Sequence, residues 1–361
     1  MFDFILKWPQ PLPVIFAVLL LGVGVFFLVK FCDIFVDSSS SIAKKLKISP
    51  LIIGLTIVAM GTSCPELAVS VSDSLSVLKE GGNANVAIGN VVGSNICNIA
   101  LVLGLSALFT PMIVKKSIIR KELPILLVVS SALVIFGCFF GKNGTLAILR
   151  WEAVILVFGI IAYLSYIVIS AKNDAKKEAK AKLKKKKKKK AAIALEDNSI
   201  KDMPIVKAIV LCVLGIAGII VGGEMVVFGA KELATEGASL IGLDPDLTAS
   251  LVGLTIVAVG TSLPELVTSV VAAKKGENEL ALGNVVGSNI FNILFVLGIS
   301  GTVNPLTTGN QFIVDVLVML AITVLLFALA LKGKLGKVHG IVLILCYAGY
   351  LAYLITRTLI A

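Results

Sequence analysis

Long apolar runs separated by short polar segments dominate this chain. Hydrophobic residues make up 57% of its 361 residues, and many runs reach the roughly 18 residues or more that let a helix cross a membrane. The pattern predicts an all-α integral membrane protein with ten spans, at about residues 12–32, 50–78, 84–108, 122–140, 151–170, 204–230, 247–273, 279–301, 312–331 and 338–359. We expect the first span to be retained, because it is too long for a signal peptide and lacks an A-x-A-like cleavage site.

Basic residues are distributed unevenly among the loops between these spans. The loops richest in Lys and Arg hold three, four, thirteen, two and three basic residues, at 44–47, 115–121, 171–204, 274–275 and 332–337, and each alternate loop holds at most two. Lys and Arg in loops favour the cytoplasmic side of a membrane. The ten predicted spans then alternate consistently, with both termini outside.

The net charge of +11 is concentrated in one segment. Residues 171–204 contain thirteen lysines and five acidic residues, including the run Lys184–Lys190. Such a run is typical of a solvated loop, and contact with anionic lipid is an alternative role. Because the excess positive charge is confined to this one segment, we do not expect the protein to bind nucleic acid. We therefore divide the chain into a first membrane half at 1–170, a lysine-rich cytoplasmic loop at 171–203 and a second membrane half at 204–361.

Two sequence motifs occur once in each half. Gly54–Ser70 (GLTIVAMGTSCPELAVS) and Gly253–Ser269 (GLTIVAVGTSLPELVTS) are identical at thirteen of seventeen positions, and Ala87–Ile99 (AIGNVVGSNICNI) matches Ala281–Ile293 (ALGNVVGSNIFNI). In the predicted topology the two copies enter the membrane from opposite faces. We therefore expect two inverted five-helix repeats, a design in which transporters bind their substrate near the midplane at discontinuous helices.

Each copy of the first motif places a glutamate, Glu66 or Glu265, within an apolar run. A carboxylate at that depth is costly and is by default a sign of function. Pro65 and Pro264 precede the glutamates and interrupt helical hydrogen bonding. The second and seventh spans should therefore be discontinuous, with freed carbonyls that protein, water or an ion must satisfy.

Oxygen-bearing side chains surround both predicted breaks and could ligate a cation. Hard cations such as Ca²⁺ take roughly six to eight oxygen ligands, and the same oxygens could hold several Na⁺ ions or protons. The candidate side chains are Thr62, Ser63, Glu66, Ser94 and Asn98 in the first half and Thr261, Ser262, Glu265, Ser288 and Asn292 in the second. For the other asparagines of the second motif, Asn90, Asn95, Asn284 and Asn289, linking of helices is the favoured role.

These motifs resemble the signature repeats of the cation/Ca²⁺ exchanger superfamily, specifically its prokaryotic Na⁺/Ca²⁺ exchanger branch. The resemblance covers nearly the whole chain except the lysine-rich loop and the extreme N-terminus. It implies an antiporter of a bacterial or archaeal cytoplasmic membrane that exchanges Na⁺ for Ca²⁺ by alternating access and needs no cofactor. It also implies that the ten candidate side chains, with the backbone oxygens of Ala59 and Ala258, are the ion ligands.

One departure from this family matters. Several relatives carry aspartate at one or both positions matching Asn98 and Asn292, whereas this chain has asparagine at both. Only two carboxylates then remain in the site, which weakens any case for K⁺ co-transport. A Ca²⁺/H⁺ antiporter of the same fold is the main alternative. An intramembrane hydrolase is less favoured, because it needs an asymmetric acid/base pair, and so is a passive channel.

Overall fold

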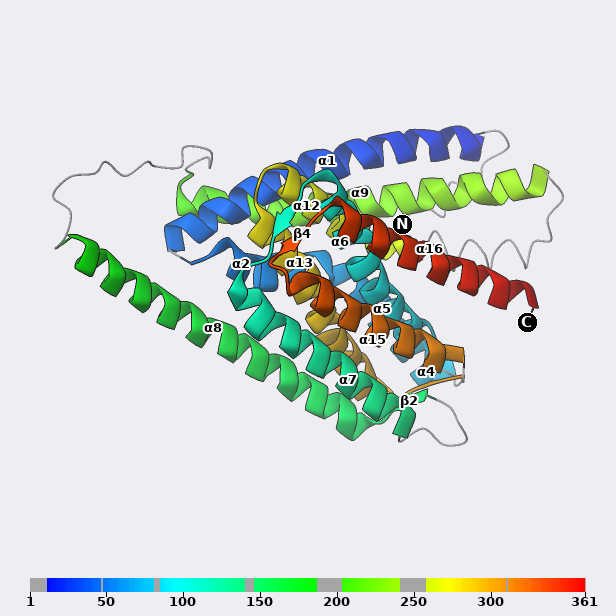
Figure 1. Ribbon diagram of the computed structural model, residues 1–361. Coiled ribbons are helices and arrows are strands. Elements are labelled where there is room, and N and C mark those ends of the chain that lie inside the picture. The colour runs from blue at the N-terminus through cyan, green and yellow to red at the C-terminus, as the bar shows by residue number, and fades with distance from the viewer. Residues whose placement is uncertain are drawn as a thin grey trace.

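Helices form nearly all of the regular structure in the computed structural model (Figure 1). The structure describes residues 12–46, 48–80, 85–139, 146–186, 203–240, 258–309 and 311–360. Up to residue 186 the elements are α1 (Leu12–Leu46), α2 (Pro50–Ile53), η2 (Gly54–Val58), α3 (Ala59–Thr62), α4 (Cys64–Glu80), α5 (Asn85–Cys97), η3 (Asn98–Val102), α6 (Leu103–Phe109), β1 (Met112–Ile113), η4 (Ile118–Glu122), α7 (Leu123–Phe139), β2 (Leu146–Ile148) and α8 (Arg150–Lys186). From residue 205 they are α9 (Ile205–Leu240), α11 (Ala258–Thr261), α12 (Leu263–Lys274), α13 (Asn278–Phe291), η6 (Asn292–Val296), α14 (Leu297–Val303), β3 (Leu306–Thr308), α15 (Gln311–Ala330), β4 (Lys334–Leu335) and α16 (Lys337–Ile360).

The helices confirm an integral membrane protein. Within the described residues, seven helices are long and apolar enough to cross a membrane, and the pair Pro50–Thr62 and Cys64–Lys79, bent by 46°, is an eighth candidate. Of the other two predicted spans, 122–140 corresponds to the 17-residue α7, and 247–273 is described only from Ala258 onward. The total of ten therefore stays a prediction.

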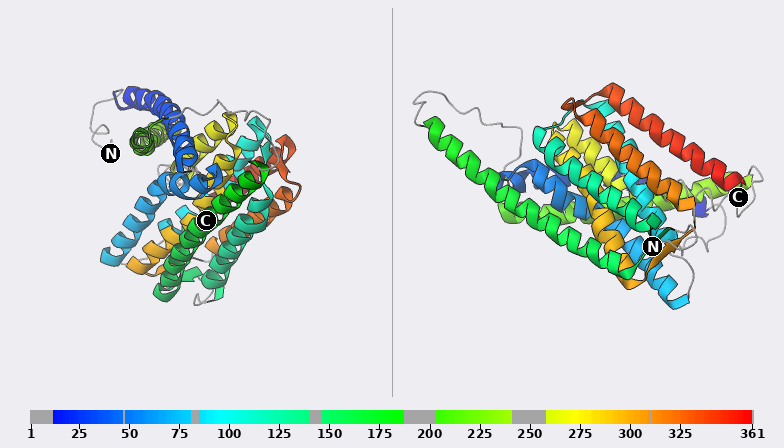
Figure 2. Two further views of the ribbon diagram at one scale, coloured as in Figure 1. Left: turned by 90° about the vertical axis from the view of Figure 1, so that its left-hand side faces the viewer. Right: turned by 60° about the horizontal axis from the view of Figure 1, so that its bottom comes forward.

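Helices α1 and α9 pack along each other at one edge of the molecule (Figure 1 and Figure 2). Glycines on α9 permit their close approach. A Cβ added at Gly222 would lie 2.9 Å from the backbone nitrogen of Leu28, and one at Gly229 would lie 2.6 Å from the carbonyl oxygen of Ala17. Any larger residue would push the two backbones apart. Small residues are the usual means of such contact between membrane helices.

The helices that carry the GNVVGSN motif lie at the centre of the molecule. Nearly every residue of α13 is buried, and it packs against α2, η2, α3 and α12. Gly54 and Gly283 face each other there. A Cβ added at Gly54 would lie 2.7 Å from the carbonyl oxygen of Leu280, and one at Gly283 would lie 2.7 Å from that of Leu51. The repeated glycines thus bring the first motif of one half onto the second motif of the other.

Contacts between the helices recur in equivalent pairs. The contact of α4 with α14 corresponds to that of α12 with α6. In the same way, the contact of α6 with α16 corresponds to that of α14 with α8. The contact of α5 with α15 corresponds to that of α13 with α7. Two short antiparallel strand pairs, which were not predicted from the sequence, are also equivalent to each other. Strand β1 pairs with β4 (Met112 opposite Leu335) and β2 with β3 (Ala147 opposite Thr307). Each strand pair joins an early segment of the chain to a late one.

Helix α8 continues beyond the residue at which we expected the lysine-rich loop to start. It runs to Lys186 and projects past its neighbours (Figure 1 and Figure 2), whereas a loop was predicted from residue 171. Alanine, lysine and glutamate are strong helix formers and are abundant over residues 171–186. The polar sequence therefore extends the helix. Residues 187–202, which include the last lysines of the run, lie outside the described residues.

The packing predicts different outcomes for a central and a peripheral glycine. A Cβ at Gly287 would lie 2.8 Å from the Cα of Leu55, but one at Gly349, on the exposed face of α16, would meet no described atom within 4 Å. Gly287→Ala should lower the free energy of unfolding by about 1–3 kcal/mol, because backbone atoms cannot move aside without strain. Gly349→Ala should be neutral, or stabilising by up to about 1 kcal/mol.

Thermal unfolding of both variants in detergent micelles measures this difference. Gly349→Ala is the control for the general effect of replacing glycine in a membrane helix. Equal unfolding midpoints for the two variants would contradict the close contact between α13 and η2.

Candidate cation site

Both predicted helix breaks are present. Ser63 (φ −86°, ψ 8°) separates α3 from α4, and Ser262 (φ −87°, ψ 3°) separates α11 from α12. Pro65 and Pro264 lie in the first turn of the helix that follows, where the missing N–H of proline is tolerated. The same residues would disrupt a continuous helix. The prolines therefore end one half-helix and begin the next at equivalent points of the two repeats.

Glu66 and Glu265 each lie in the first turn of the half-helix after the break. Both side chains are fully buried, and the two carboxylates lie within coulombic reach of each other. The N-terminal end of a helix carries the equivalent of roughly +0.5 elementary charge, which favours a carboxylate at that position. Two negative groups from distant parts of the chain therefore meet in one buried region, each at a helix N-terminus.

The Glu265 carboxylate is held by hydroxyl groups from both halves. Its Oε1 accepts hydrogen bonds from Ser63 Oγ at 3.0 Å and from Ser288 Oγ at 3.3 Å. Because Ser63 belongs to the other broken helix, the two breaks touch directly. Glu66 lies beside Ser94, the counterpart of Ser288, but within the described part of the chain neither of its carboxylate oxygens has a hydrogen-bond partner. The two glutamates thus have equivalent neighbours and different hydrogen bonding.

Two threonine–asparagine hydrogen bonds link the halves in a matching pattern. Thr62 Oγ1 donates to Asn284 Oδ1 over 3.1 Å, and Thr261 Oγ1 donates to Asn90 Oδ1 over 3.3 Å. Each threonine hydroxyl also lies 3.4 Å from the serine hydroxyl of the same GNVVGSN motif. The hydroxyl at each break is therefore bound by the central helix of the opposite half.

Two further asparagines exchange hydrogen bonds between the central helices. Asn95 Nδ2 donates to the Asn289 carbonyl oxygen at 3.3 Å, and Asn289 Nδ2 donates to the Asn95 carbonyl oxygen at 3.2 Å. Asn292 Nδ2 donates to Asn95 Oδ1 at 3.1 Å. Asn95 and Asn289 occupy the same place in the two motif copies. Their reciprocal bonds join α5 to α13, as amide groups between membrane helices commonly do.

Several buried polar atoms around the carboxylates have no hydrogen-bond partner among the described residues. They are both carboxylate oxygens of Glu66, Oε2 of Glu265, Oγ of Ser262, Oδ1 and Nδ2 of Asn98, and Oδ1 of Asn289 and Asn292. A buried polar atom left unpaired costs about 1–3 kcal/mol, more if charged, and folded proteins satisfy nearly all of them. All but one of these atoms are oxygens, and hard cations such as Ca²⁺ bind oxygen ligands.

The carboxylates in this region number only two. Among the described residues, no cluster of three or more His, Cys, Asp and Glu side chains could hold a metal ion. Any cation bound between Glu66 and Glu265 must therefore complete its shell with neutral hydroxyl, amide or carbonyl oxygens. That combination suits Ca²⁺ or Na⁺ better than a transition metal, which favours nitrogen or sulfur ligands.

The structure shows direct contacts among many of the predicted site residues. Thr62, Ser63, Glu265 and Ser288 form one hydrogen-bonded group. The corresponding group in the other half is Thr261, Ser94 and Glu66. Of the remaining predicted ligands, Ser262 lies at the second break, and Ala59 and Ala258 begin α3 and α11. Asn98 and Asn292 are buried, and within the described residues their amide oxygens accept no hydrogen bond.

Sequence reasoning missed two serines that belong to this network. Ser70 Oγ accepts a hydrogen bond from Asn90 Nδ2 at 3.0 Å, and Ser269 Oγ accepts one from Asn284 Nδ2 at 2.9 Å. Both serines are the last residue of the repeated seventeen-residue motif and are identical in its two copies. Their identity in the two copies could have revealed them, because helix packing alone would accept alanine at either position.

An ion-pair cluster ties α1 to the core near this site. Lys275, directly after α12, lies 2.6 Å from Asp37 and 3.1 Å from Asp33, both on α1. Cys32 Sγ on the same helix lies 3.4 Å from Thr268 Oγ1 on α12. The helix that carries Glu265 is therefore fixed to α1 by both charged and neutral contacts.

Comparisons with known proteins were made for the whole chain. The profile of a family described as "Sodium/calcium exchanger protein" matches residues 16–171 and 207–356. A putative antiporter, CaxA of Alkalimonas amylolytica, is 37% identical over 92% of this chain and 97% of its own. The sodium/calcium exchanger MaX1 of Methanosarcina acetivorans is 36% identical over 93% of this chain and 97% of its own. A solved structure of the sodium–calcium exchanger NCX_Mj matches 94% of this chain and 99% of its own, with 32% identity and a TM-score of 0.73.

The unpaired oxygens predict that a divalent cation stabilises the folded protein. Ca²⁺ at about 100 times its dissociation constant should add about 2.7 kcal/mol to the free energy of unfolding. Differential scanning fluorimetry in detergent, with and without Ca²⁺, measures the rise in unfolding temperature. Glu66→Gln and Glu265→Gln should each abolish the rise, whereas Glu279→Gln, which removes an ion pair with Lys115 elsewhere, should retain it. An unchanged rise in either of the first two variants would contradict the site.

Proposed function

This chain belongs to the sodium/calcium exchanger family, and on that premise we propose that it exchanges Na⁺ for Ca²⁺ across the cytoplasmic membrane of a prokaryote. Glu66 and Glu265 form one midplane site that faces the two sides of the membrane alternately. The transported ions are its substrates, and no other cofactor takes part. Like other members of an exchanger family, it is a transporter rather than an enzyme.

One observation carries the proposal: two buried carboxylates, from two equivalent helix breaks, are surrounded by oxygens that lack hydrogen-bond partners. In this proposal the ligands are the side chains of Thr62, Ser63, Glu66, Ser94, Asn98, Thr261, Ser262, Glu265, Ser288 and Asn292, with the carbonyl oxygens of Ala59 and Ala258. Two carboxylates neutralise one Ca²⁺ ion. The carboxylates without a cation would repel each other, so the site favours a loaded state.

The proposed architecture has ten membrane helices in two inverted repeats, at 1–170 and 204–361, joined by the lysine-rich segment 171–203. The recurring helix contacts, the two strand pairs and the reciprocal Asn95–Asn289 hydrogen bonds support it, because a two-fold axis would generate each of them. The broken helices α3–α4 and α11–α12 then correspond to the second and seventh spans. Such breaks near the midplane are where inverted-repeat transporters bind ions.

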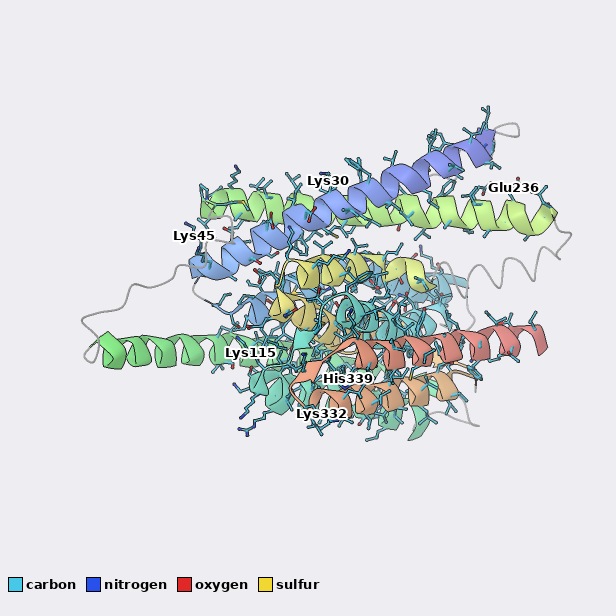
Figure 3. All side chains as sticks on the ribbon, turned by 45° about the horizontal axis from the view of Figure 1, so that its top comes forward. Lys30, Lys45, Lys115, Glu236, Lys332 and His339 are labelled. Atoms are coloured by element: carbon cyan, nitrogen blue, oxygen red, sulfur yellow. The ribbon has the colours of Figure 1, made fainter. Side chains whose placement is uncertain are left out.

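The proposed orientation places both termini outside and the lysine-rich segment in the cytoplasm. Figure 3 supports it: Lys45 and Lys115, from two loops predicted to be cytoplasmic, lie toward one side of the view, and Glu236 lies at the opposite end. Basic residues in loops favour the cytoplasmic side. The end nearer Lys45 and Lys115 is then the inner face.

Competition for the same carboxylates makes the exchange obligatory. Ca²⁺ binds at the midplane, the pair α1 and α9 slides across the core, and Ca²⁺ leaves on the other side; Na⁺ returns through the same oxygens. A ligand shifts the equilibrium between inward-facing and outward-facing states only by its differential affinity for them. A partly loaded protein must therefore not change readily between the two states, because that change would leak ions.

The number of Na⁺ ions per Ca²⁺ sets the gradient that the exchanger can sustain. Each Na⁺ entering down a tenfold gradient at 100 mV releases about 3.7 kcal/mol, and moving Ca²⁺ out against that potential costs about 4.6 kcal/mol. Two Na⁺ ions leave about 2.8 kcal/mol, a Ca²⁺ gradient of about two decades, and three leave about 6.5 kcal/mol, between four and five decades. Keeping cytosolic Ca²⁺ low therefore favours three.

Uptake of ⁴⁵Ca²⁺ into proteoliposomes tests the exchange. Uptake should require internal Na⁺, should fail in K⁺-loaded vesicles, and should be lost in Glu66→Gln and Glu265→Gln but not in the Glu279→Gln control. Uptake driven equally well by an acid interior would assign the protein to the Ca²⁺/H⁺ class. Flux through a passive channel would need no counter-ion and would not saturate. No Ca²⁺ flux under any gradient would refute the ion assignment.

The stoichiometry has a separate electrical signature. Three Na⁺ leaving per Ca²⁺ entering moves one net positive charge out of the vesicle. With valinomycin and high external K⁺, the inside-positive potential should therefore accelerate ⁴⁵Ca²⁺ uptake into Na⁺-loaded vesicles. An exchange of two Na⁺ for one Ca²⁺ is electroneutral and would not respond.

A further inference from the structure

The asparagines of the GNVVGSNxxN motif fall into two groups by their hydrogen bonding. Asn98 and Asn292, the last of each motif, have buried amide oxygens to which no described group donates a hydrogen bond. Asn90 and Asn284, the first of each motif, use both ends of the amide. The first pair of residues is thus available to a cation, and the second pair is already engaged with the protein around it.

The amide nitrogens of Asn90 and Asn284 hold the backbone next to each glutamate. Asn90 Nδ2 lies 3.1 Å from the carbonyl oxygen of Glu66, and Asn284 Nδ2 lies 3.5 Å from that of Glu265. A carbonyl oxygen can only accept, so the NH₂ group must face it. The amide oxygen of each asparagine then points the other way, toward the threonine of the opposite half.

The threonine hydroxyl has one proton and a choice of partners. Thr62 Oγ1 lies 3.1 Å from Asn284 Oδ1, 3.1 Å from the carbonyl oxygen of Val58 and 3.4 Å from that of Ala59. If the proton goes to a helix carbonyl, that oxygen is occupied by the hydroxyl. If it goes to Asn284, the carbonyl oxygens stay free, and the hydroxyl can turn its lone pairs to a cation.

We infer that Asn90 and Asn284 are positioning residues of the cation site rather than ligands. Each accepts the hydroxyl proton of a threonine from the opposite half, so that the threonine oxygen and the nearby carbonyls face the ion. Each also anchors the backbone of the glutamate in its own half. The inference rests on the proposed function, because it assigns a role within the same site.

This arrangement couples the two halves of the site. Asn284 is bonded to the backbone of Glu265 and to Thr62, and Asn90 is bonded to the backbone of Glu66 and to Thr261. A shift of one half relative to the other would therefore move a ligand hydroxyl and a carboxylate together. Residues that orient metal ligands in this way typically change affinity about 10–100-fold when they are replaced.

A double-mutant cycle on Ca²⁺ affinity tests the inference. Isothermal titration calorimetry in detergent would compare the wild type, Asn284→Leu, Thr62→Val and the double variant. Leucine keeps the approximate size of asparagine without its polar atoms, and valine keeps the shape of threonine without its hydroxyl. We expect Asn284→Leu to weaken Ca²⁺ binding about 10–100-fold. Its effect should be clearly smaller once Thr62 is valine, because only the contact with the Glu265 backbone is then left to lose.

Other outcomes separate the inference from the proposed function. A wild type that binds no Ca²⁺ would refute the function and the inference with it. Wild-type binding with an unaltered Asn284→Leu affinity would refute only the inference, and so would fully additive losses, because Asn284 would then act independently of Thr62.

The unfolding temperature without Ca²⁺, measured for all four proteins, separates loss of affinity from loss of fold. If Asn284→Leu does not fold, the equivalent cycle uses Asn90→Leu and Thr261→Val. Those two side chains are only partly buried, so their replacement should disturb the packing less.

Discussion

Two carboxylates buried together at membrane depth are the constraint on which this structure depends. Glu66 and Glu265 are fully buried, and their charges must be balanced by helix termini, by hydroxyl donors or by a cation. Each requirement explains a local feature. The breaks at Ser63 and Ser262 supply the helix N-termini, and the prolines after them make those breaks obligatory. Close glycine contacts then bring the first broken helix against the central helix α13.

Local signals made much of this predictable from the sequence. A proline beside a glutamate in an apolar run marks a broken helix, and its repetition marks two equivalent breaks. The hydrogen bonds between the halves left no such signal, since Thr62 and Asn284 are 222 residues apart. The serines that support the asparagines did leave a signal, their identity in the two motif copies, but their hydrogen bonds to Asn90 and Asn284 became evident only from the fold. The helical extension of α8 was missed because a lysine run reads as a solvated loop even where its residues favour helix.

The contacts of α1 and α9 differ in kind from those of the central helices. Their shared face is lined by glycines at backbone distance, whereas α5 and α13 are joined by directional amide hydrogen bonds. The close packing holds α1 and α9 to each other as one unit, and the directional bonds hold α5 and α13 in one geometry. In the proposed cycle α1 and α9 move as a pair while the central helices keep the ligands in place. The ion pairs of Lys275 with Asp33 and Asp37 must then be remade during that movement.

The central claim is that one cation binds between the two glutamates, and anomalous diffraction tests it most directly. Crystals of the protein soaked in Sr²⁺, a heavier analogue of Ca²⁺, would locate bound divalent ions by their anomalous signal. The account predicts one strong peak within ligand distance of both Glu66 and Glu265, absent from crystals of Glu66→Gln. Separate peaks at each glutamate, or a peak elsewhere with none between them, would contradict a single shared site.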